Sequence, residues 1–84
     1  MVDIKLYNPE SKVRVYDSYG RSRDGEIIRY EIRSLPKYDM YGFPNKQKIR
    51  IYAYVYYGKE DWSTIICSSD GSLPSFVKLI EEAV

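Results

Sequence analysis

The fold is decided by residues 46–57, which read KQKIRIYAYVYY. Apolar and polar side chains alternate through this stretch, and a period of two predicts the longest strand of a half-buried sheet. One side of the strand carries Ile49, Ile51, Ala53, Val55 and Tyr57. The other side carries Lys48, Arg50, Tyr52, Tyr54 and Tyr56. We assign the first side to the core, so the second is a basic, tyrosine-rich face.

The same alternation continues on both sides of this stretch. It predicts four further strands, at residues 2–7, 12–19, 26–35 and 62–67. The longest connection is Pro36–Asn45, which joins two strands that we expect to form an antiparallel hairpin. Symmetry about this loop predicts that Ile32 pairs with Ile49 and that Tyr30 pairs with Ile51.

The last segment changes its period. After a turn at residues 68–72, apolar side chains recur at helical spacing from Leu73 to Val84, which predicts a C-terminal helix. The predicted fold is therefore α+β: one domain, residues 1–84, with a five-stranded, mostly antiparallel sheet and one C-terminal helix packed on one face. The helix should cover Val13, Val15, Ile28, Ile32, Ile49, Ile51 and Trp62. The strand at 62–67 leaves open whether Ile65 and Cys67 or Trp62 and Ile66 face it.

The composition argues against catalysis. Histidine is absent, and Cys67 is the only cysteine, so the chain lacks a Cys–His pair, a zinc set and an internal disulfide. The glycines do not form a phosphate-binding loop, and the acids fall mostly in turns. We expect a binding protein with no cofactor and no metal. Without a signal pattern or an apolar run of about 20 residues, we expect it to be soluble and cytoplasmic.

Charge is unevenly distributed, although the net charge is only +1. Between Lys12 and Arg50 there are ten basic residues against five acidic ones. Because one helix covers one face, the opposite face stays open, and our first hypothesis is that it binds nucleic acid. Arg14, Arg29, Arg33, Lys48 and Arg50 would contact phosphates, and Tyr16, Tyr52 and Tyr54 would stack on bases.

The alternative is protein binding, because Tyr and Arg are enriched at protein interfaces. The residues for that function are Met40, Tyr41 and Phe43, at the tip of the 36–45 loop, with Tyr54 and Tyr56 on the strand. The partner is a protein bound by an interaction or inhibitor module, of the kind that mobile elements or viruses encode, or a second copy in a homodimer. A third interpretation assigns no function to these residues. Tyr is a favourable strand residue, and the loop could fold back over the core.

Overall fold

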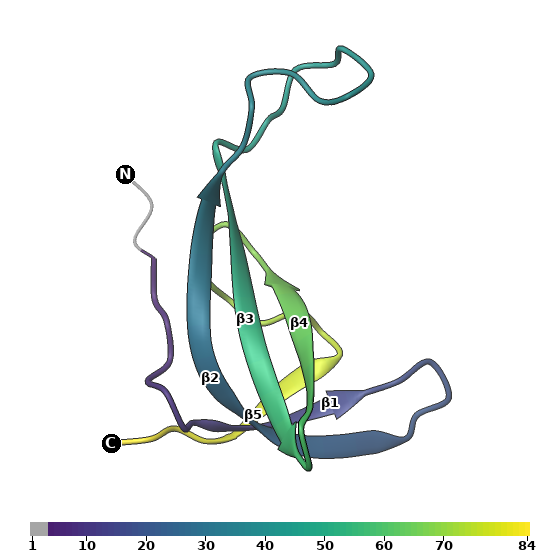
Figure 1. Ribbon diagram of the computed structural model, residues 1–84, viewed down its shortest axis with the longest axis vertical. Helices are drawn as coiled ribbons and strands as arrows, with labels where there is room; N and C mark the ends of the chain where they lie inside the picture. Colours follow the sequence, from purple (N-terminus) through teal and green to yellow (C-terminus); the bar gives the residue numbers. More distant parts are fainter. Residues whose placement is uncertain (1–3) are drawn as a thin grey trace.

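The structure is a strand meander whose last strand returns to pair with the first. The computed structural model describes residues 4–84 and forms one five-stranded antiparallel sheet (Figure 1). Its strands are β1 (Lys12–Tyr16), β2 (Ser22–Ser34), β3 (Ile49–Gly58), β4 (Asp61–Cys67) and β5 (Val77–Glu81). They lie in the order β4-β3-β2-β1-β5, so β4 and β5 are the two edges.

Strand β2 is long enough to belong to both halves of the sheet. Its first part, Ser22–Glu26, pairs with β1, and the part from Glu26 to Ser34 pairs with β3. Gly25 lies against β3 so closely that a Cβ atom there would stand 2.7 Å from the Val55 side chain and 2.9 Å from the Tyr56 carbonyl oxygen. A bulge follows directly, between Ile27 and Arg29. Glycines and bulges are where strands bend, and β1 and β5 run across the lower end of the other strands (Figure 1).

The core lies inside this bent sheet. Its buried residues are Val13, Ile27, Ile51, Ala53, Val55, Ile65, Cys67 and Val77, contributed by all five strands. Two irregular segments add to it, since Tyr7 and Leu73 pack against the cluster. They also meet each other, because the Lys5 N–H donates to the Asp70 carbonyl oxygen at 2.9 Å. The sheet therefore covers its apolar face by folding on itself, and no helix is needed for that purpose.

The prediction of a C-terminal helix is wrong. No helix occurs between residues 4 and 84, and the segment contains the short strand β5, paired antiparallel with β1. Val77 is buried while Phe76 and Ile80 are exposed. The apolar residues expected to share one buried face of a helix therefore do not share one environment. An isolated helix of three turns is marginal in water. A strand in the same place also satisfies the backbone groups along the open edge of β1.

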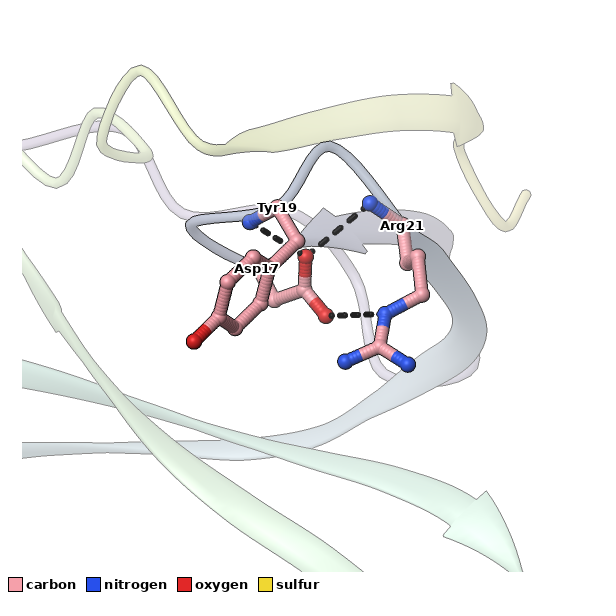
Figure 2. Close-up of polar contacts among 3 residues, drawn as sticks. All are labelled: Asp17, Tyr19 and Arg21. Carbon is pink, nitrogen blue, oxygen red and sulfur yellow. Dashed lines mark hydrogen bonds and ion pairs between the residues drawn. The ribbon is translucent and has the colours of Figure 1, made fainter.

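Two of the predicted strands also need correction. Residues 4–7 are not a strand, and the rest of the predicted strand at 2–7 lies outside the described residues. The strand predicted for 12–19 stops at Tyr16, because Asp17 organises the turn that follows. Its carboxylate accepts hydrogen bonds from the N–H groups of Tyr19 and Arg21 and from Nε of Arg21 (Figure 2). Asp commonly stabilises turns in this way.

The hairpin of β2 and β3 forms with a register two residues from the predicted one. Ile32 pairs with Ile51 rather than Ile49, and Tyr30 pairs with Ala53 rather than Ile51. A shift of two residues keeps every side chain beyond the bulge on its predicted face, because the strand repeat is two. The bulge does change which residue of β2 belongs to the core: Ile28 is exposed, and Ile27 is buried in its place.

Candidate functional site

The side of β2, β3 and β4 that points away from the core is a continuous polar and aromatic surface, which we call the outer face. The structure places Tyr52, Tyr54 and Tyr56 there, in alternation with buried Ile51, Ala53 and Val55. The outer face consists of Glu26, Arg29, Glu31 and Arg33 from β2, Arg50, Tyr52, Tyr54 and Tyr56 from β3, and Trp62, Thr64 and Ile66 from β4. From Arg50 to Tyr56 it extends about 20 Å, at about 3.3 Å per residue.

Tyr54 is the structural centre of the outer face. Only 9% of its surface is exposed. Its hydroxyl donates to Oε2 of Glu31 at 2.5 Å, the Arg29 guanidinium carbon lies 4.2 Å from its ring centroid, and the Trp62 ring is tilted against it at 5.7 Å. A ring covered in this way is not available for stacking on a base. Tyr54 therefore contacts its neighbours on the sheet and leaves little surface for the base contact that the sequence suggested.

The outer face carries two carboxylates, Glu26 beside Tyr56 and Glu31 at the basic end, and Glu31 is held by its neighbours. Nε of Arg33 donates to it at 2.6 Å, Tyr54 donates from the other side, and Nη1 of Arg29 lies 3.8 Å away. The hydrogen bond from Arg33, followed by that from Tyr54, lowers the pKa of Glu31 from 4.5 to about 2. Glu31 is thus ionised at neutral pH and compensates one of the arginines.

The end of the outer face nearest the 36–45 loop is basic. Arg33 and Arg50 are direct cross-strand partners, and like charges placed opposite each other are destabilising. Arg33 has Glu31 as a partner, but Arg50 makes no ion pair with any residue from 4 to 84. Exposed Lys48 precedes β3 in the same alternation. These three cations and one carboxylate form a site suited to an anion.

The opposite end of the outer face is aromatic. Tyr56 and Trp62 are direct partners in the pairing of β3 with β4, and their side chains are 40% and 55% exposed. The question left open by β4 is settled here: Ile65 and Cys67 are buried, whereas Trp62 and Ile66 point outward. The prediction of Trp62 in the core was therefore wrong. The two-residue turn of Lys59 and Glu60 pairs Gly58 with Asp61, and a bulge between Tyr56 and Gly58 then aligns Tyr56 with Trp62. The turn alone would have paired Trp62 with Tyr57, on the core side, so the sequence held no signal for this placement.

Arg14 and Tyr16 do not join the other predicted site residues. They lie on β1, which pairs with the first part of β2 and with β5 and not with β3. Arg14 is engaged by Asp24 through two hydrogen bonds, of 2.7 and 3.2 Å, and this contact lowers the pKa of Asp24. Tyr16 lies beside Lys78, whose Nζ is 5.6 Å from the ring centroid. The predicted set of eight is thus divided between the two halves of the sheet.

The 36–45 loop, which we call the finger, projects from the end of the hairpin (Figure 1). It has its own small β-bridge between Tyr38 and Pro44. Its tip residues Met40, Tyr41 and Phe43 are 87%, 78% and 67% exposed, so the finger does not fold back over the core. Tyr54 and Tyr56 lie farther along β3, so the structure separates the tip from the tyrosines that the protein-binding hypothesis grouped with it.

The remaining chemistry of the described chain is limited. Cys67 is buried, and burial raises the pKa of its thiol. Residues 4–84 contain no group of three or more Cys, Asp or Glu side chains arranged to hold a metal ion. Over the same residues no helix has the length and apolar character required to cross a membrane. Comparisons with protein family models, with curated proteins and with solved structures found no match.

Proposed function

We propose that this protein binds nucleic acid, and specifically unpaired strands, through the outer face of β2, β3 and β4. The observation that supports this most directly is the cross-strand pair of Arg33 and Arg50, which lies on the same face as exposed Trp62 and Tyr56. The arrangement leaves a like-charge pair that a bound anion would stabilise. Phosphates provide that anion, and aromatic rings on a sheet provide stacking surfaces for bases.

The two ends of the face have different tasks in this proposal. Arg33, Arg50 and Lys48 contact the phosphate backbone, while Trp62 and Tyr56 stack on bases about 20 Å away. Tyr54 and Arg29 support the Trp62 ring through the contacts described above. Arg14 and Tyr16 are not part of the proposed site, because they lie on the other half of the sheet.

A titration with single-stranded oligonucleotides tests this function. Trp62 is the only tryptophan in the chain, so its fluorescence reports on this face directly. We expect quenching on binding, and an affinity that falls steeply as salt rises from about 50 to about 200 mM. A duplex of the same sequence should bind more weakly, because its bases are already stacked. Binding that is absent, or that ignores salt, would contradict the proposal.

Two arginines provide a matched comparison. Arg50→Ala should weaken binding and reduce the slope of log K against log salt by about 0.7, the value of one phosphate contact on a single strand. Arg14→Ala removes the same charge from the other half of the sheet and should leave the slope unchanged. Trp62→Ala should cost about 1–3 kcal/mol of binding free energy, which is a loss of about 5- to 150-fold, without changing the slope.

A further inference from the structure

The finger presents apolar side chains in an ordered form. The Asp39 carboxylate accepts hydrogen bonds from the N–H groups of Tyr41 and Phe43 at 2.9 and 3.0 Å, and the Asp39 N–H donates to the Phe43 carbonyl oxygen at 2.8 Å. Gly42 supplies the positive φ of 84° that this turn requires. A loop held in its presented shape loses little entropy on binding. Exposed apolar side chains held in this way are suited to fill a pocket.

A cavity of about 440 Å³ lies at the other end of β3. Gly25 of β2 is among its lining residues, and we call it the Gly25 cavity. Tyr56, Tyr57, Gly58 and Ile80 form its apolar lining, and Lys12, Asp24 and Glu26 form its polar part. Tyr57 is held in place by Arg23, whose guanidinium carbon is 4.0 Å from the ring centroid. The volume is within the range of small binding pockets, and it can hold one aromatic side chain.

The surroundings of the finger and of the cavity carry opposite charges. A second cavity of about 420 Å³ shares Lys12 and Glu26 with the first and adds three carboxylates, from Glu10, Glu81 and Glu82. The finger and its base, residues 36–48, contain three lysines, Lys37, Lys46 and Lys48, against the single acid Asp39. The Asp39 carboxylate is already engaged by the backbone of the turn. Opposite potentials of this kind favour encounter in one orientation.

We propose that the finger of one copy inserts into the Gly25 cavity of a second copy of the chain. Phe43 or Tyr41 fills the apolar part of the cavity, and Lys37 and Lys46 meet Glu81 and Glu82. The finger projects from one end of the β2–β3 hairpin (Figure 1), and the residues that line the cavity lie at the other end. Each contact is therefore head-to-tail and leaves a second finger and a second cavity unfilled. Such a contact repeats into rings or open chains.

Sedimentation velocity of the purified chain, without nucleic acid, tests this contact. At low salt the average mass should rise with concentration beyond that of a dimer, and added salt should reverse the rise. Phe43→Ser should lower the association constant by about tenfold or more. Tyr19→Ser is the control, because Tyr19 is also an exposed aromatic residue, 82% exposed against 67% for Phe43, and it lies in the β1–β2 turn. A mass that stays monomeric, or association that Phe43→Ser leaves intact, would overturn the proposal.

Charge reversal identifies the two surfaces separately. A Lys37→Glu, Lys46→Glu double variant should be monomeric, because its finger then repels its own type of cavity. A Glu81→Lys, Glu82→Lys double variant should be monomeric for the converse reason. A mixture of the two should associate again, since each finger then meets a cavity of opposite charge. If the mixture remains monomeric while both variants show wild-type unfolding transitions, the proposed pairing is incorrect.

Discussion

Glu31→Gln is the substitution that separates fold stability from binding most clearly. Glutamine has the shape of glutamate and can still accept the hydrogen bond from the Tyr54 hydroxyl. It cannot compensate the charge of Arg33, whose Nε is 2.6 Å from the Glu31 carboxylate in the wild type. We therefore expect the variant to be less stable at neutral pH and, at the same time, to bind nucleic acid more tightly.

The size of the gain in affinity follows from the number of counterions that the protein displaces from the nucleic acid. In the wild type Glu31 offsets the charge that Arg33 presents to a phosphate, so removing the carboxylate charge adds the equivalent of one phosphate contact. This steepens the slope of log K against log salt by about 0.7 for a single strand. Extrapolated from 1 M salt, where the ionic contribution vanishes, to 0.1 M, this difference is a gain of about fivefold. The gain should shrink at higher salt and grow at lower salt.

Fluorescence anisotropy of a labelled single-stranded oligonucleotide at three salt concentrations measures this difference. Glu81→Gln is the control, because it makes the same change in net charge on β5, in the other half of the sheet. Equal gains in both variants would mean that only overall charge matters. An affinity that is unchanged or reduced in Glu31→Gln would refute the assignment of Arg33 as a phosphate contact.

Two further predictions concern stability. Because its contacts lower the pKa of Glu31 from 4.5 to about 2, the ionised carboxylate stabilises the fold fully above about pH 4.5, and this contribution is lost as the pH falls through about 2. The difference in urea midpoint between wild type and Glu31→Gln should therefore shrink across that window, and a constant difference would count against the contacts of Glu31. Gly25→Ala should cost about 1–3 kcal/mol, or about 5–20 °C in Tm, because its Cβ meets the Tyr56 carbonyl oxygen at 2.9 Å. Ser34→Ala on the same strand is the control and should unfold like the wild type, and equal stability of Gly25→Ala would show that β2 does not need glycine to bend.

The alternating strands were predictable because a period of two records which face of a strand is buried. The pattern in residues 46–57 predicted the position of β3. It also placed Ile51 on the opposite face from Tyr52 and Tyr54, which is correct although the predicted register was wrong by two residues. The bulge at Ile28 was not predictable from the pattern, since Ile27 and Ile28 are adjacent and equally apolar. Only the pairing with β3 decides which of them is buried.

The candidate site was predictable only for the residues on β2 and β3. Arg29, Arg33 and Arg50 belong to one hairpin, so local alternation was enough to place them on one face. Arg14 and Tyr16 were grouped with them because a flat sheet has a single open face. The bend at Gly25 turns β1 away from that face. This bend accompanies the close approach of Gly25 to β3, and a contact between two strands is not visible in the sequence.

By itself, the sequence determined the strands of the hairpin and the chemistry of each of its faces, because these follow from the order of neighbouring side chains. It left open whether the 36–45 loop folds back over the core, and the structure shows that its tip is exposed. The tertiary structure decided that residues 77–81 are a strand, that Trp62 is on the outer face and that Tyr54 is covered. Each of these depends on a contact that alternation along one strand does not record: the open edge of β1, the bulge that aligns β3 with β4, and the guanidinium of Arg29. Local periodicity cannot report such contacts, because the free energy that selects them arises only when the distant segments meet.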